Sequence, residues 1–188
     1  MTSQTLIRTF VIAVLGVVAA TPLGATVYVT ADLAELTAEA RAVAYGRVVA
    51  LEPRWVDGRR GIETLVTLRV ESYAKGDMGE QVTLRVPGGQ MGPYRSVMLG
   101  APRFVEGEEV VVFLASPGAA IPHLVGLAQG VYRVRPDRTT GARVVTPEVA
   151  SGALPAAPAR VVRGDGSRRP AALSAFLDRV RVLAGAAR

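Results

Sequence analysis

Hydrophobic and polar positions alternate most regularly over residues 62–73. One face of this segment carries Ile62, Thr64, Val66 and further apolar residues, whereas the other face is polar apart from Leu65. Such alternation predicts a strand with one face in the core and the other in water, as in an antiparallel sheet. Similar segments follow after turns, so we expect six or seven short strands, over residues 42–51, 62–73, 82–86, 109–114, 124–127, 131–134 and 142–146.

Turn residues divide these segments at regular intervals. Gly46 lies inside the first strand, where glycine is typical of a bulge or a bend that lets a small sheet curl. Pro53 is expected to end the pairing of that strand, and residues 56–61 are expected to form a charged turn. Short strands with frequent turns favour a mainly β fold, a small antiparallel barrel or sandwich, over residues 26–146.

Helical spacing replaces the alternation at both ends of the predicted sheet. It predicts a short amphipathic helix over residues 31–39, with Thr30 as its N-cap and Asp32 in its first turn. Pro170 is expected to open a C-terminal amphipathic helix over residues 170–188. Its apolar stripe could dock on the sheet, bind a partner or lie on a membrane surface; it comprises Leu173, Phe176, Leu177, Val180 and Leu183. Residues 147–169, rich in Pro, Ala and Gly, are predicted to be a linker.

The first residues have the plan of a secretory signal peptide. Arg8 precedes an apolar run at 10–20, and small residues follow up to Ala25. This run is shorter than the roughly 20 residues that a spanning helix needs, although an uncleaved anchor is the alternative. We expect a signal peptide over residues 1–25 and a secreted or periplasmic protein. The chain has no cysteine, which excludes disulfides and thiol chemistry.

Positive charge is concentrated near the C-terminus. Residues 26–158 carry equal numbers of basic and acidic residues, whereas residues 159–188 carry seven arginines and two aspartates. The sequence pI of about 10.4 would suit a nucleic-acid partner. The excess charge, however, lies in a tail without base-stacking aromatics, so we expect no nucleic-acid partner. A solvated tail is the simplest interpretation, with weak contact between the basic tail and anionic surfaces as the alternative.

Residues with catalytic potential are sparse. His123 is the single histidine, and one histidine without cysteine cannot supply the ligand set of a typical zinc site. The serines show no nucleophile-elbow pattern. Glu106, Glu108 and Glu109 cluster around Gly107, but at a turn they are expected to face water rather than to form an acid–base pair. The sequence therefore predicts no catalytic residue, no metal site and no cofactor.

Two aromatic residues and a glycine-rich segment are the candidate binding residues. Gly88, Gly89 and Gln90 could suggest a phosphate loop, but the lysine and hydroxyl of such a loop are missing and no helix follows. Glycines here are expected to allow positive φ in a loop across a barrel mouth. Trp55 and Tyr94 lie beside loops and could face a ligand, with packing in the core or at the rim as the alternative. We predict that these five residues form a binding surface.

Several short motifs occur in a characteristic order: AVAYGRV at 42–48, YAKG at 73–76, PGG at 87–89 and FVEGEEV at 104–110. This order is similar to that in a group of uncharacterised secreted bacterial proteins, and more distantly it resembles the netrin-like domain of tissue inhibitors of metalloproteinases. The resemblance covers about residues 32–134. It implies an OB-like, five-stranded Greek-key barrel with flanking helices. Those inhibitors chelate the protease zinc through an N-terminal cysteine, which this chain lacks, so that mechanism does not carry over.

Three functions follow as hypotheses. The first is an exported, non-enzymatic module of the cell envelope or extracellular space that binds an unidentified protein or envelope component through barrel-mouth loops. The second is a small hydrolase, acting through His123 or the glutamates at 106–109, or a protein like a protease inhibitor. The third is a structural envelope protein tethered by its C-terminal helix. We favour the first, because small barrels commonly bind through loops at one mouth, which is an analogy from fold.

Overall fold

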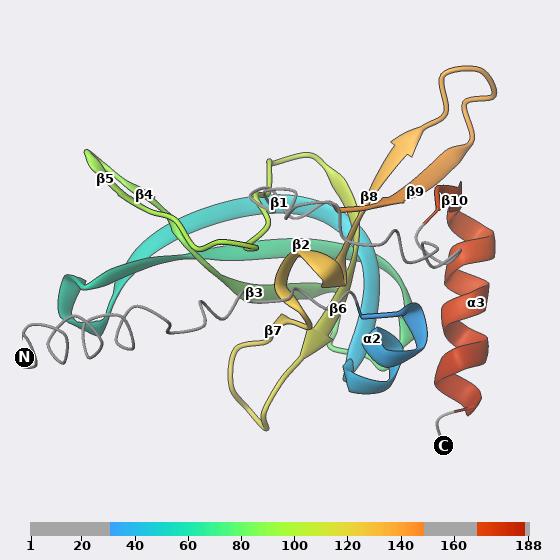
Figure 1. Ribbon diagram of the computed structural model, residues 1–188, viewed down its shortest axis with the longest axis horizontal. Helices are drawn as coiled ribbons and strands as arrows, with labels where there is room; N and C mark the ends of the chain where they lie inside the picture. Colours follow the sequence, from blue (N-terminus) through green and yellow to red (C-terminus); the bar gives the residue numbers. More distant parts are fainter. Residues whose placement is uncertain (1–30, 149–168, 187–188) are drawn as a thin grey trace, which may run out of the picture.

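The computed structural model describes residues 31–148 and 169–186. In these residues the protein is mainly β, with one large sheet, a small two-stranded sheet and two helices (Figure 1). The predicted signal peptide and most of the predicted linker lie outside the described residues. No helix in the described part is both long and apolar enough to cross a membrane.

Most of the elements are strands, with a helix near each end of the described part and two short 3-10 segments between. In chain order they are α2 (Leu33–Glu39), β1 (Ala42–Val56), the 3-10 turn η1 (Asp57–Arg59), β2 (Gly61–Lys75), β3 (Gln81–Pro87), β4 (Gly89–Met91), β5 (Tyr94–Ser96), β6 (Glu109–Ala115), β7 (His123–Leu124), η2 (Leu127–Gly130), β8 (Val131–Pro136), β9 (Arg143–Pro147), β10 (Ala171–Ala172) and α3 (Leu173–Ala186).

The large sheet has the strand order β1-β2-β3-β7-β6-β8-β9-β10, and β1 pairs in addition with β6. The pairings of β1, β2, β3, β7 and β6 thus form a circuit that returns to β1. Every pairing is antiparallel except that of β3 with β7, where Arg85 lies opposite His123. Because β7 has only two residues, the paired stretch of backbone in this circuit is shortest at this strand.

The first two strands are longer than the sequence predicts. The expectation that Pro53 ends the pairing is wrong, because Pro53 lies opposite Thr64 and β1 continues to Val56. On its other side, β1 pairs with β6 only over Ala42–Arg47. At Pro53 the strand therefore has one free edge, where a residue without an N–H is tolerated.

Gly46 allows β1 and β2 to approach each other closely. The predicted irregularity is confirmed, because the register of the two strands shifts between Tyr45 and Gly46. A Cβ atom at position 46 would lie 2.3 Å from the carbonyl oxygen of Arg69. The backbone contact therefore requires glycine at this point of the sheet.

The helix α2 begins two residues later than the sequence predicts. Asp32 is its N-cap rather than a first-turn residue, and Thr30 lies outside the described residues. The Asp32 carboxylate accepts a hydrogen bond from the Glu35 backbone N–H at 2.7 Å, and the Glu35 carboxylate accepts one from the Asp32 N–H at 3.0 Å. These reciprocal bonds form a capping box, which fixes the start of the helix.

The C-terminal helix docks on the sheet. The predicted helix is confirmed, but α3 begins at Leu173, because Ala171 and Ala172 pair with β9 as the short strand β10. The side chains of Leu173, Phe176, Leu177 and Val180 on its apolar stripe are buried. The ring centroid of Phe176 lies 4.7 Å from that of Tyr132 on β8. Of the three alternatives for this stripe, docking on the sheet is therefore the one that the structure shows.

Two apolar clusters lie on opposite faces of β1, β6 and β8. The outer core lies between these strands and the two helices and includes Tyr45, Phe113 and Tyr132. The inner core lies among the strands of the circuit and includes Val48, Val66, Leu84, Val112 and Leu114, among others. Because β6 is covered on both faces, its sequence is a continuous apolar run rather than an alternating one.

Candidate functional site

A groove of about 730 Å³ opens at one end of the inner core, beside the β4–β5 hairpin. Its floor is apolar and is formed by Leu51, Val66, Val86 and Phe104, each of which belongs to the inner core or packs against it. Leu51 and Phe104 are partly exposed, whereas the two valines are buried, so the end of the core is accessible only at the first two residues. A ligand that reaches this floor would bury apolar surface, which is favourable by about 25 cal/mol per Å².

The rim of the groove exposes an unusual run of apolar side chains. The segment after β5 contributes Val97, Met98 and Leu99, which are 65%, 49% and 78% exposed. Single exposed apolar residues are ordinary, but three in a row beside an apolar cavity are typical of surfaces that bind a ligand or a partner.

A smaller hollow of about 440 Å³ continues the groove. Trp55 and Tyr94 line it, with ring centroids 5.4 Å apart in an edge-to-face arrangement. Arg95 and Ser96 line both cavities, so the two adjoin at β5. Together the groove and this aromatic hollow form one elongated site along the hairpin.

The Gly-Gly segment brings the hairpin close to β2. Gly88 and Gly89 have φ angles of 96° and 150°, so the expectation of positive φ is confirmed, but Gly89 and Gln90 belong to strand β4 rather than to a loop. A Cβ atom on Gly89 would lie 2.6 Å from the hydroxyl oxygen of Thr64, and that hydroxyl donates a hydrogen bond to the Gly88 carbonyl at 2.8 Å. The two glycines thus fix the hairpin at the side of the groove.

Unpaired positive charge surrounds the site. Four exposed arginines line the two cavities, and none makes an ion pair with another described residue; they are Arg59, Arg60, Arg95 and Arg103. Glu148 is the one acidic residue among the described residues that line the site, and its carboxylate is paired with Arg133. The site therefore attracts negative charge.

Arg133 on β8 stabilises one wall of the groove. Its guanidinium forms ion pairs with Glu108 and Glu148 and donates a hydrogen bond to the Arg103 carbonyl. It also lies over the ring of Phe104, 5.2 Å from the centroid. Burial lowers the pKa of Arg133, but Glu148 and Glu108 outweigh that effect and the net pKa is raised. The charge is therefore permanent, and it holds the segment before β6 in place.

The five residues predicted to form a binding surface fall on this one elongated site. Gly88, Gly89 and Gln90 line the groove, whereas Trp55 and Tyr94 line the aromatic hollow. Sequence reasoning missed the apolar run at 97–99 and the arginines beside it. An available signal was the segment RSVMLGAPR at 95–103, which is apolar between two arginines and has no strand alternation.

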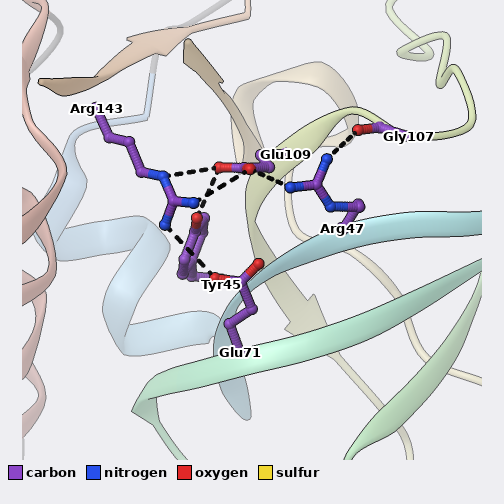
Figure 2. A network of polar contacts seen from close by, with 6 residues as sticks. All are labelled: Tyr45, Arg47, Glu71, Gly107, Glu109 and Arg143. Atoms are coloured by element: carbon purple, nitrogen blue, oxygen red, sulfur yellow. Dashed lines mark hydrogen bonds and ion pairs between the residues drawn. The ribbon is translucent and has the colours of Figure 1, made fainter. Parts of the chain in front are cut away.

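A second polar cluster centres on Glu109 at the start of β6 (Figure 2). Its carboxylate accepts a hydrogen bond from the Tyr45 hydroxyl at 2.7 Å and pairs with Arg47 and Arg143. Arg143 also lies 3.6 Å from the Glu71 carboxylate. Burial, followed by the hydrogen bond and the charge of Glu109, raises the pKa of the Tyr45 hydroxyl. The cluster thus fastens strands β1, β2, β6 and β9 to one another.

These contacts correct one expectation about the acidic turn. The turn at 106–108 is present, but Glu108 and Glu109 do not simply face water, since their side chains are only 20% and 16% exposed and each is paired with arginine. Glu106 is exposed, as expected. Carboxylates held by hydrogen-bonded arginines act as structural contacts, and the described residues contain no group of acidic or histidine side chains suited to a metal ion.

His123 begins β7, at the strand entrance that the sequence indicates. Its Nδ1 atom is buried and has no hydrogen-bond partner among the described residues, so no carboxylate orients the ring through that atom.

A scan against models of protein families finds no match, and a search of curated proteins also finds none. Function is therefore inferred from the site alone.

Proposed function

We propose that this protein is an exported, non-enzymatic binding module that holds its ligand in the groove and the adjoining aromatic hollow. The observation that carries the proposal is the run of exposed side chains at Val97, Met98 and Leu99 beside a groove whose apolar floor is partly accessible. Water-exposed apolar surface of this kind is costly to leave uncovered, and it is typical of binding sites. The ligand is a protein or another component of the envelope or extracellular space.

We further propose that the circuit of five strands is an OB-like barrel, related to the netrin-like domain. Antiparallel pairing of β1 with β2 and β6, and the parallel pairing of β3 with β7, support this assignment. In such a barrel the groove corresponds to one mouth of the closed sheet, where loops of small barrels commonly bind.

The two other hypotheses receive less support. A tether needs the apolar stripe of α3 to be available to a membrane, but its main residues are buried against the outer core. A hydrolase needs paired acid and base groups, but Glu108 and Glu109 are held by arginines. Glu106 is exposed at the turn, and no carboxylate contacts the buried Nδ1 atom of His123 among the described residues.

A capture experiment tests the proposed function. The full-length protein, with a C-terminal tag so that the signal peptide can be cleaved, is purified from the envelope of its own source with bound components. Leu99→Asp places a charge at the groove, where the side chain is 78% exposed, and is expected to abolish capture. Val182→Asp is the matched control, because Val182 is 71% exposed on α3, at the opposite end of the molecule (Figure 1). Capture that survives Leu99→Asp contradicts the proposal.

A further inference from the structure

The elongated site suits an extended chain. The groove and the aromatic hollow adjoin through Arg95 and Ser96, and each volume exceeds that of a single side chain. An extended peptide places alternate side chains about 7 Å apart, so successive apolar side chains can enter successive hollows. In the described residues β5 pairs only with β4, which leaves its other edge open to main-chain hydrogen bonds from such a peptide.

The exposed apolar rim favours a protein segment over a small apolar ligand. A small molecule or acyl chain within the groove would cover the exposed parts of Leu51 and Phe104 on the floor. Val97 and Leu99 also line the groove, but they are 65% and 78% exposed, so a ligand confined to the groove would leave much of their surface in water. A polypeptide that enters the groove and also passes over its rim covers both surfaces.

The positive charge of the site favours a segment with negative charge. The arginines at 59, 60, 95 and 103 have no ion-pair partner among the described residues. This chain's own residues 149–168, which continue from Glu148 at the groove, carry three arginines and one aspartate. Because like charges repel, these residues are poorly matched to the site, whereas carboxylates match it.

We propose that the occupant of the site is an extended, acidic segment of a partner protein. Its apolar side chains enter the groove and the aromatic hollow, and its carboxylates face Arg95 and Arg103 at the groove and Arg59 and Arg60 at the hollow. The inference rests on the proposed function and adds the chemical class of the ligand.

Peptide selection on the purified mature protein tests the ligand class. The probe is a library of random twelve-residue peptides, in which charge and hydrophobicity are not chosen beforehand. Selected peptides are expected to be enriched in both Asp or Glu and large apolar residues. Arg95→Glu combined with Arg103→Glu is expected to weaken a selected peptide by at least about tenfold at low salt, and added salt should weaken wild-type binding.

The control variant carries the same change in net charge at a distance from the groove. Arg138→Glu with Arg179→Glu alters the exposed turn after β8 and the exposed side of α3, and should change affinity by less than about threefold. An equal loss in both double variants overturns the proposal, because the effect would then be one of overall charge. Circular dichroism of each variant verifies the fold.

Other occupants give different results, and each overturns the proposal. If residues 149–168 occupy the groove, no peptide would be selected. If the ligand is an anionic lipid, the protein would bind phosphatidylglycerol vesicles in a way that depends on the arginines, and acidic peptides would not be selected. Peptides without acidic enrichment also overturn it. Envelope capture that Leu99→Asp abolishes would still support the proposed function in these cases, so the two failures are distinguishable.

Discussion

At the scale of single residues, neighbours in the sequence take unlike roles that only the tertiary contacts distinguish. Glu106 is exposed at the turn, whereas Glu108 pairs with Arg133 and Glu109 accepts from Tyr45. These partners lie on β8 and β1, so no local pattern reveals them. The places of Trp55 and Tyr94 beside loops can be recognised in the sequence, but their ring contact depends on how the separate β4–β5 hairpin lies against the end of β1.

Arg133 gives a residue-scale prediction. Arg133→Met removes the cation between Glu108 and Glu148, whose side chains are 20% and 19% exposed. Two partly buried carboxylates then lose their partner, and we expect the free energy of unfolding to fall by about 2 to 3 kcal/mol.

Urea unfolding measures the loss, and Arg143→Met provides the control. Arg143 also pairs with two glutamates but is 50% exposed, so the same replacement should cost less than about 1 kcal/mol. Equal losses in the two variants would show that burial at Arg133 adds nothing.

At the scale of elements, most strands can be predicted from the sequence, but the residues at which they begin and end cannot. Alternation predicts β2, and the apolar run predicts β6. The expectation that Pro53 ends the pairing is wrong, because β6 leaves β1 before that point and the sheet then tolerates a proline at the free edge. Similarly, Pro170 is a reasonable helix start by local rules, yet the residues after it pair with β9 before α3 begins. Edges and pairings belong to the assembled sheet, so local preference is overridden at these points.

Gly46 gives an element-scale prediction. In Gly46→Ala the new Cβ would lie 2.3 Å from the Arg69 carbonyl oxygen, so β1 or β2 must move. We expect the free energy of unfolding to fall by at least about 2 kcal/mol, measured by urea unfolding. Gly185→Ala is the matched control, because no atom lies within 4 Å of its Cβ position on α3. There alanine should stabilise by up to about 0.5 to 1 kcal/mol. Similar values at the two positions would refute the close-approach argument.

At the scale of the whole molecule, the two ends are connected through shared strands. The β4–β5 hairpin and α3 lie at opposite ends (Figure 1), and β1 runs from Tyr45 in the outer core to Trp55, which lines the aromatic hollow. The sequence indicated a mainly β fold and an amphipathic C-terminal helix. It could not indicate that β1, β6 and β8 carry one core on each face, because that requires knowing what covers each face.

Shared strands predict a single cooperative unfolding transition. Loss of α3 exposes the outer face of β8 at Tyr132, and the same strand contributes Val131 to the inner core, so neither core should persist alone. Trp55 is the only tryptophan, and its fluorescence reports the end of β1, where its ring contacts that of Tyr94 on β5. In urea, this fluorescence and the circular dichroism at 222 nm should therefore change with coincident midpoints. Phe176→Ala should move both midpoints together, by an amount equivalent to about 3 kcal/mol. A helical signal that is lost before the Trp55 signal would mean that α3 is an independently unfolding attachment.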